Sequence, residues 1–322
     1  MKEKKTMLND RITLLVIVGP TAVGKTKIAI EVAKKLGTEI ISSDSMQIYR
    51  YMDIGTAKPT KEEQVEVRHH MIDIINPDED FSVADFQNMA NNHIKSISTS
   101  KKIPILSGGT GLYINSVCYN YQFSEVDSDE SLRQELLEEA KKNGIMALYK
   151  KLQTIDPAAA KKIHPNNKRR VIRALEVCIS TGKTFSHYEE MTKVHGSLYN
   201  TVMIGLTMPR VQLYDRINER VELMFKSGLI DEVKMLLNMG YSKHLNSMQA
   251  IGYRQIIEYL EGNITKEEAK YLIARDTRRY AKRQYTWFLR DKNIVWFDVS
   301  RGGTNKIASS IINIVEGKTK NT

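Results

Sequence analysis

Short apolar runs alternate with segments of helical periodicity along the first third of the chain. Four runs have the length and composition of buried strands, and they occupy residues 12–18, 39–43, 67–75 and 103–107. Two segments with a helical pattern lie between them, at 24–36 and 83–97. Strands that alternate with helices in this order are typical of a parallel sheet covered by helices, so the pattern predicts an α/β fold.

The pattern changes after about Tyr119. Three helical segments follow, and we place them at 124–142, 144–153 and 166–180. The later chain returns to mixed pattern, with a strand at 201–208, helical pattern at 211–260, a long helix at 266–289 and a last strand at 293–299. We therefore predict an α/β core made of residues 1–120 and 200–322, which is interrupted by a helical insertion domain at 121–199.

Composition and charge exclude some classes of protein but do not identify the function. The 322 residues carry 48 Lys and Arg against 38 Asp and Glu, a net charge of +10 that suits a polyanionic partner but also a merely solvated surface. The longest apolar stretch is about seven residues against the roughly 20 that a membrane helix needs, so we expect a cytoplasmic protein. Cys118 and Cys178 form no CxxC pair, and we expect both to be buried and inert.

The sequence GPTAVGKT, residues 19–26, follows the first predicted strand and opens the first predicted helix. It matches the P-loop pattern, in which glycines let backbone N–H groups surround phosphate oxygens. Lys25 would add a positive charge, and the hydroxyl of Thr26 is suited to bind Mg²⁺. The fold class is accordingly a P-loop-type parallel sheet core flanked by helices, and the pattern taken alone suggests a nucleotide such as ATP.

The type of phosphate stays open at this point, because the usual second acidic strand end is missing. The strand at 103–107 ends in Ser107-Gly108-Gly109, without an aspartate. The acidic candidate is Asp44, just past the second strand. Its carboxylate could hold Mg²⁺ through water, act as a base, or only cap a turn or helix, and the residues alone leave these alternatives open.

Eight motifs make the chain resemble a known family, the tRNA dimethylallyltransferases or tRNA isopentenyltransferases, in their bacterial form. The motifs occur in the order GPTAVGKT, DSMQIYR, MDIGTAKP, HHMID, SGGTGLY, NNKRRVIRALEV, QAIGYRQ and RRYAKRQYTWF, and they span about residues 12–290. The resemblance implies transfer of a dimethylallyl group from dimethylallyl diphosphate to N6 of adenine 37, next to the anticodon of tRNA. It also implies Mg²⁺ as cofactor. We expect the protein to be a monomer that does not act at a membrane.

The resemblance further implies roles for particular residues. Asp44 is similar to the general base on the adenine amine, Thr21 to a diphosphate contact near the bond that breaks, and Arg220 to an arginine that neutralises the diphosphate. Thr26 and Asp44 would bind Mg²⁺. The diphosphate would be held by the P-loop residues Gly19, Pro20, Thr21, Ala22, Val23, Gly24, Lys25 and Thr26. Contacts to tRNA are implied for Asp44, Ser45, Met46, Gln47, Thr110, Arg133, Arg169, Arg170, Val171, Ile172 and Arg173.

A basic face is predicted on the long helix at 266–289. At about 100° per residue, five basic side chains fall within one arc of about 140°. They are Arg275, Arg278, Arg279, Lys282 and Arg283. The opposite side carries Tyr280, Gln284, Trp287 and Phe288, which we place in the core. We expect the basic face, in particular Arg279 and Arg283, to bind the phosphate backbone of RNA.

Three other functions remain as alternatives. A prenyltransferase that acts on free nucleotide would share the P-loop and Asp44 but would need no large tRNA-binding surface. A P-loop kinase or NTPase would turn over ATP, and the missing acidic strand end argues against it. A nucleic-acid-binding module with a vestigial P-loop is disfavoured by the presence of both Lys25 and Asp44.

Overall fold

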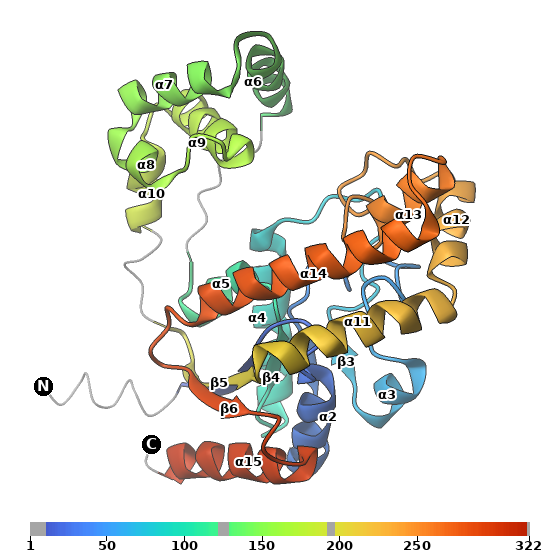
Figure 1. Ribbon diagram of the computed structural model, residues 1–322. Coiled ribbons are helices and arrows are strands. Elements are labelled where there is room, and N and C mark those ends of the chain that lie inside the picture. Colours follow the sequence, from blue (N-terminus) through green and yellow to red (C-terminus); the bar gives the residue numbers. More distant parts are fainter. Residues whose placement is uncertain (1–10, 122–128, 192–196, 321–322) are drawn as a thin grey trace, which may run out of the picture. The chain divides into compact units, whose positions relative to one another are not determined.

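The computed structural model describes residues 11–121, 129–191 and 197–320 (Figure 1). The chain divides into two compact units, one made of Met1–Cys118 with Ser197–Thr322 and the other of Tyr119–Gly196. This division falls close to the predicted boundaries at residues 120 and 200. Residues 122–128, which include the start of the predicted helix at 124–142, lie outside the described ranges.

The larger unit is built on a parallel sheet, as the sequence pattern predicted. Within the described residues the sheet has six strands in the order β3-β2-β4-β1-β5-β6, all paired in parallel. Their bounds are β1 Thr13–Val18, β2 Ile40–Ser42, β3 His69–His70, β4 Ile105–Gly108, β5 Asn200–Thr207 and β6 Val295–Asp298. Because β1 lies between β4 and β5, the loop that follows it opens at the centre of the carboxyl edge, where ligands of open α/β sheets usually bind.

Helices cover both faces of this sheet. On one face α2 (Lys25–Leu36) and α15 (Thr304–Lys320) pack against each other, and Leu15 and Ile17 of β1 contribute to the same buried core. On the other face lie α4 (Val83–Thr99) and α5 (Gly111–Cys118), which also contact each other. The buried position of β1 between two helical layers explains its unbroken apolar sequence.

The predicted strand at 67–75 is wrong over most of its length. Only His69–His70 pairs with β2, and residues 61–66 form the short helix α3 (Lys61–Glu66) just before it. Met71 and Asp73 adopt left-handed backbone conformations, with φ of 63° and 55°. Such residues end an extended strand, although the chain pairs once more through a single bridge between Tyr49 and Ile75.

The helical pattern at 211–260 is divided into three helices. They are α11 (Arg210–Lys226), α12 (Leu229–Asn238) and α13 (Tyr253–Leu260). Gly228, Gly240 and Gly252 interrupt the pattern with φ near +100°, a conformation that favours glycine. The long helix is α14 (Lys266–Phe288), which contacts α11 and α13 and confirms the predicted helix at 266–289.

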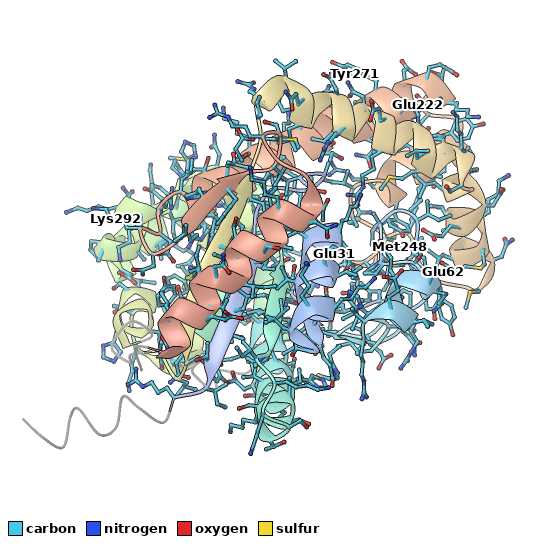
Figure 2. The ribbon with its side chains drawn as sticks, turned by 90° about the horizontal axis from the view of Figure 1, so that it is seen from below. Glu31, Glu62, Glu222, Met248, Tyr271 and Lys292 are labelled. Atoms are coloured by element: carbon cyan, nitrogen blue, oxygen red, sulfur yellow. The ribbon has the colours of Figure 1, made fainter. Side chains whose placement is uncertain are left out.

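Side chains in this part of the larger unit sort clearly into core and surface. Met248, in the segment before α13, is fully buried, whereas Glu62 of α3, Glu222 of α11 and Tyr271 of α14 are exposed (Figure 2).

Cys118 and Cys178 are both free and buried, as expected. Of the helices that the structure describes, none combines the length and the apolar character needed to cross a membrane.

The smaller unit is helical, and its elements are α6 (Glu130–Asn143), α7 (Ile145–Ile155), α8 (Pro157–Lys162), α9 (Lys168–Thr181) and α10 (Phe185–Met191). Its core includes Leu148 and Leu152 of α7 together with Val171 and Leu175 of α9. The Asp156 carboxylate caps α8 by accepting a hydrogen bond from the backbone N–H of Ala159, and it also accepts hydrogen bonds from the backbone N–H and the hydroxyl of Ser186. The predicted helices at 144–153 and 166–180 are confirmed to within a few residues.

Candidate active site

The P-loop turns sharply between β1 and α2. Gly19 lies so close to β5 that a Cβ atom there would be 2.7 Å from the carbonyl oxygen of Leu206. Ala22 and Gly24 both have positive φ, 64° and 99°, and Gly24 begins α2. The amino end of α2 therefore points into the loop, where its unpaired N–H groups and its dipole favour an anion.

Lys25 is held inside this loop. Its ammonium Nζ donates a hydrogen bond of 2.8 Å to the carbonyl oxygen of Pro20. Burial lowers the pKa of Lys25 to about 8; Asp44 opposes this shift and Arg220 adds to it. A bound anion would restore the charged form, so the site favours a negatively charged ligand.

Two arginines one helical turn apart on α11 line the same space. Burial lowers the pKa of the Arg220 guanidinium, and the nearby carboxylate of Asp44 opposes that shift. Arg216 reaches the loop from the side, with its Nη1 3.4 Å from the carbonyl oxygen of Val23. Arg216 is not among the site residues predicted from sequence, although its spacing of four residues from Arg220 places both on one helix face.

Asp44 follows β2, and one of its carboxylate oxygens takes part in a local hydrogen bond. Its Oδ1 accepts a hydrogen bond of 2.9 Å from the backbone N–H of Met46. This is the capping role that the sequence left open, but it does not exclude chemistry, because a carboxylate has a second oxygen with further acceptor sites. The same side chain lines the pockets described next.

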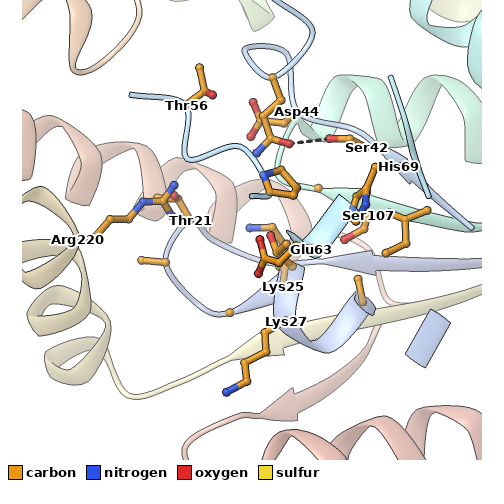
Figure 3. A pocket seen from close by; sticks show the side chains of 18 of the residues that line it. Thr21, Lys25, Lys27, Ser42, Asp44, Thr56, Glu63, His69, Ser107 and Arg220 are labelled. Atoms are coloured by element: carbon orange, nitrogen blue, oxygen red, sulfur yellow. Dashed lines mark hydrogen bonds between the residues drawn. The ribbon is translucent and has the colours of Figure 1, made fainter. Parts of the chain in front are cut away.

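Two pockets meet at the carboxyl edge of the sheet. The first, here called the P-loop pocket, has a volume of about 480 Å³ and is lined by Gly24, Lys25, Thr26 and Arg216 among others (Figure 3). The second, the arginine pocket, has a volume of about 530 Å³ and is lined by Arg254, Arg279 and Arg283. Four residues line both, and we call them the junction: Thr21, Asp44, Thr56 and Arg220.

The arginine pocket takes its charge mainly from α14. Arg279 and Arg283 are exposed along it, as predicted, whereas the neighbouring carboxylate of Asp276 is buried. Asp276 accepts hydrogen bonds from Arg254 at 2.5 Å and Arg275 at 2.9 Å. Burial opposes ionisation of Asp276, but these arginines hold its pKa below the ordinary value.

The prediction that Trp287 lies in the core is wrong, because its side chain is 39% exposed, while Gln284 and Phe288 are buried as expected.

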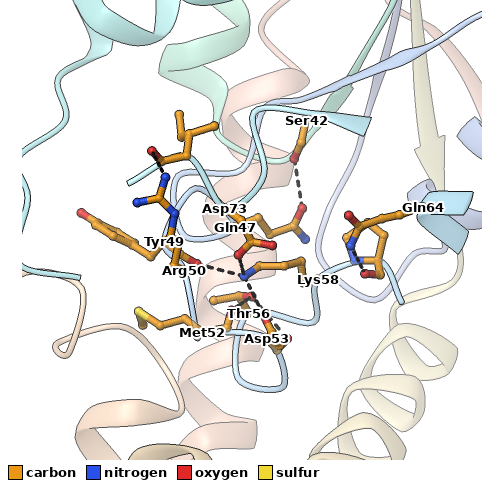
Figure 4. A network of polar contacts seen from close by, with 12 residues as sticks. Ser42, Gln47, Tyr49, Arg50, Met52, Asp53, Thr56, Lys58, Gln64 and Asp73 are labelled. Atoms are coloured by element: carbon orange, nitrogen blue, oxygen red, sulfur yellow. Dashed lines mark hydrogen bonds and ion pairs between the residues drawn. The ribbon is translucent and has the colours of Figure 1, made fainter. Parts of the chain in front are cut away.

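The loop that carries Thr56 is fixed by two buried charges. The ammonium of Lys58 binds the carbonyl oxygen of Tyr49 at 2.9 Å and the carboxylates of Asp53 and Asp73 at 2.5 and 2.6 Å (Figure 4). From α12, the carboxylate of Glu232 accepts hydrogen bonds from three successive backbone N–H groups, those of residues 53–55, and from the hydroxyl of Tyr253. These contacts explain the motifs MDIGTAKP and QAIGYRQ as parts of one wall of the site.

Comparisons with known proteins agree with this arrangement. The family model of IPP transferases matches residues 47–292. The chain belongs to the IPP transferase family. A tRNA dimethylallyltransferase of Alkaliphilus oremlandii is 54% identical over 287 residues, 89% of this chain and 91% of that protein, and one of Carboxydothermus hydrogenoformans is 54% identical over 299 residues, 93% and 96%.

Solved structures show the same likeness. A crystal structure of a tRNA isopentenylpyrophosphate transferase from Bacillus halodurans is 50% identical, with a TM-score of 0.72 and coverage of 96% of this chain and 97% of that one. A eukaryotic dimethylallyltransferase acting on tRNA is 29% identical, with a TM-score of 0.75, over 89% of this chain and 74% of that one. The six-stranded parallel sheet with flanking helices is thus the fold of this family.

In this member of the family, the predicted RNA contacts of the larger unit separate into two groups. Ser45 and Met46 line the arginine pocket beside Arg279 and Arg283. Gln47 does not; its side chain is 8% exposed, lines the P-loop pocket and accepts a hydrogen bond of 3.0 Å from Ser42. The Gln47 side chain therefore supports the loop, and its predicted RNA contact stays a prediction.

Thr110 also supports the junction. Its hydroxyl accepts a hydrogen bond of 3.1 Å from the backbone N–H of Ser45, and it acts to lower the pKa of Tyr280 of α14. Burial, with Asp44 nearby, raises the pKa of Tyr280 to about 12, so this phenol stays neutral. Thr110 therefore fixes the segment after Asp44, a role that the sequence did not reveal, and its predicted RNA contact stays a prediction.

The remaining predicted RNA contacts lie in the helical unit. Arg169 and Arg170 are exposed at the start of α9. The side chains of Val171 and Ile172 are in the core, 0% and 4% exposed, and the predicted RNA contact of this segment stays a prediction. Arg133 and Arg173 both contact the buried carboxylate of Glu176, with N–O distances of 3.1 and 3.0 Å, so both stabilise the unit whatever else they bind.

Proposed function

We propose that this chain transfers a dimethylallyl group from dimethylallyl diphosphate to N6 of adenine 37, beside the anticodon of tRNA. The observation that carries the proposal is the junction, where an anion-binding P-loop pocket and a basic pocket share Thr21, Asp44, Thr56 and Arg220. A diphosphate in one pocket and an extruded adenine in the other would bring their reacting atoms to the same four residues. The names of the relatives support the choice of substrates.

Asp44 is the group we assign to the acceptor. The exocyclic amine of adenine is a weak nucleophile, because its lone pair is delocalised into the ring. As N6 attacks the allylic carbon, the carbon–oxygen bond to the diphosphate breaks and the amine loses a proton. The free oxygen of the Asp44 carboxylate, held in place by the bond from Met46 to Oδ1, is positioned to accept that proton.

The P-loop pocket then serves the leaving group. Departure of diphosphate develops negative charge on its bridging oxygen, which donors fixed in advance can stabilise. Lys25, Arg216 and Arg220 line the space where that charge would form. No phosphoryl group is transferred in this scheme, which is consistent with the absence of an aspartate in the described residues 105–109 at the end of β4.

Mg²⁺ fits this site as a proposed cofactor. The hydroxyl of Thr26 and the carboxylate of Asp44 both line the P-loop pocket. Mg²⁺ in proteins usually takes one or two such oxygens and completes its shell with phosphate oxygens and water. Bound there, it would offset charge on the diphosphate.

The helical unit is proposed to hold the anticodon arm. Support comes from the exposed Arg169 and Arg170 at the start of α9, where phosphate oxygens would also meet the helix N-terminus. A cytoplasmic location and a monomeric state remain predictions.

The test of the proposed function compares acceptors. Incubation with labelled dimethylallyl diphosphate and tRNA, followed by nucleoside analysis, is expected to place the label on N6-isopentenyladenosine. AMP in excess should neither accept the label nor compete, because it lacks the anticodon arm. Label on AMP would favour the free-nucleotide alternative, and tRNA-independent ATP hydrolysis would favour an NTPase.

A further inference from the structure

Gln284 joins three segments that are far apart in the sequence. From α14, its side-chain oxygen Oε1 accepts a hydrogen bond of 2.8 Å from the backbone N–H of Thr21, 263 residues away. Its nitrogen Nε2 donates a hydrogen bond of 3.0 Å to the carbonyl oxygen of Gly109, 175 residues away. The side chain is 5% exposed, so both bonds lie in a water-poor environment where they are strong and directional.

The hydrogen bond from Thr21 to Gln284 holds the P-loop at the one P-loop residue that belongs to the junction. The N–H groups of a P-loop usually turn towards phosphate, but that of Thr21 is directed at Gln284. The next residue, Ala22, is in a left-handed conformation, so the turn here has little freedom to rearrange. The orientation of Thr21 towards the junction therefore depends on the position of one side chain on α14.

The same stretch of α14 forms the wall of the arginine pocket. Tyr280, one helical turn before Gln284, lines that pocket, and Gln284 and Thr110 both act to lower the pKa of its hydroxyl. Arg283, the residue before Gln284, lines it as well. The same turn of α14 thus lines the proposed adenine site with Tyr280 and Arg283 and holds the P-loop with Gln284.

We propose that Gln284 is a positioning residue for the prenyl transfer, acting through Thr21 rather than by touching substrate. The inference rests on the proposed function of the junction. The site requires one acceptor for the Thr21 N–H and one donor for the Gly109 carbonyl, which is the pair that an uncharged amide supplies. A glutamate would place an oxygen against the Gly109 carbonyl, and a methionine would satisfy neither group.

A purely structural role makes a different prediction. A buried glutamine that only satisfies two backbone groups would lower stability when replaced, and it would leave turnover per folded molecule unchanged. A positioning role lowers kcat, because displacements of about 1 Å at reacting groups reduce rates by roughly 100-fold. It has little effect on KM for the diphosphate, because Gly24, Lys25 and Thr26, which line the P-loop pocket, are unchanged.

The experiment measures kcat, both KM values and the melting temperature for wild type, Gln284→Met and Gln284→Glu. We expect kcat to fall roughly 100-fold for Gln284→Met and less for Gln284→Glu, which keeps the acceptor for Thr21, with KM for dimethylallyl diphosphate within about threefold. Thr286→Ala is the control, since this exposed hydroxyl on the same helix donates, among the described residues, only to the carbonyl oxygen of Lys282 in its own helix.

Gly109→Ala perturbs the same contact from the other side. A Cβ atom at this position would lie 2.1 Å from Nε2 of Gln284, so the amide must move, while the backbone of Gly109 does not have a positive φ. We expect a loss of kcat similar to that of Gln284→Met. In the Gln284→Ala background, which removes the obstructing amide, Gly109→Ala should cause almost no further loss.

Each outcome decides between the two roles. If wild type labels tRNA and the Gln284 variants keep kcat within about threefold, the positioning role is refuted, even when their melting temperatures fall. Independent, multiplicative effects of Gly109→Ala and Gln284→Ala would also overturn it. If wild type fails to label tRNA, the proposed function itself is wrong.

Discussion

The ammonium of Lys25 donates its hydrogen bond to the carbonyl oxygen of Pro20, five residues earlier in the same P-loop. The charge that would meet a diphosphate is thus held beside the loop backbone before any anion binds. Burial lowers its pKa from 10.5 to about 8, with Asp44 and Arg220 acting in opposite directions. Burial of this ammonium therefore has one measurable effect on catalysis and another on stability.

The first consequence is a pH dependence of substrate capture. Lys25 is charged below pH 8 and loses its proton as the pH rises through its pKa of about 8. We expect kcat/KM for dimethylallyl diphosphate, measured at saturating tRNA from pH 6 to 9.5, to decline above about pH 8. Lys25→Arg stays charged throughout and should remove the decline. An identical decline in wild type and Lys25→Arg would assign it to another group.

The second consequence is a stability cost of Lys25. Its folded pKa is lower than its unfolded value, so folding disfavours the charged form. The penalty is complete below about pH 8 and disappears as the pH approaches 10.5. Lys25→Met should therefore raise the free energy of unfolding at pH 7 by about 1–2 kcal/mol, the shift being reduced by partial exposure and by the lost bond to Pro20. Urea unfolding at pH 7 and pH 10 tests this; a variant less stable than wild type at pH 7 would contradict it.

Charge on the arginine pocket should control RNA affinity. Arg283 is exposed on α14 and lines the pocket, with its guanidinium over the ring of Tyr280. Arg283→Glu should weaken tRNA binding at low salt and reduce the slope of log K against log salt concentration by ~1 to 2. Arg301→Glu, on an 85% exposed side chain beyond β6, is the matched control and should change neither. Equal slopes for wild type and Arg283→Glu would mean that this face is only solvated.

Glu176 should be a stability residue of the helical unit. Its carboxylate is fully buried and pairs with Arg133 and Arg173, whose side chains are 35% and 40% exposed. Glu176→Leu should lower the free energy of unfolding by about 1–3 kcal/mol, less than for a wholly buried pair because both arginines can reach water. A double-mutant cycle with Arg133→Met measures the coupling by urea unfolding. Unchanged stability of Glu176→Leu would show that the pair contributes nothing.

The local parts of the site could be predicted from sequence, because strand, P-loop and helix follow one another along the chain. Long-range partners could not. Nothing near Gln284 indicates that its amide binds Thr21, and nothing near Thr56 indicates that the distant Glu232 holds its loop. Val171 and Ile172 were predicted as part of a contiguous segment, but a helix turns consecutive residues to different faces, and these two face the core.

The most direct test of the account is the single-turnover transfer of labelled dimethylallyl to an anticodon stem-loop by wild type and Asp44→Asn, with both substrates saturating. Asparagine keeps an oxygen for the N–H of Met46 but is not a base at neutral pH. We expect a rate lower by roughly 10²- to 10⁴-fold, with the dissociation constant for the stem-loop within about threefold of wild type. A single-turnover rate equal to that of wild type would contradict the assignment of Asp44 as the base at the junction.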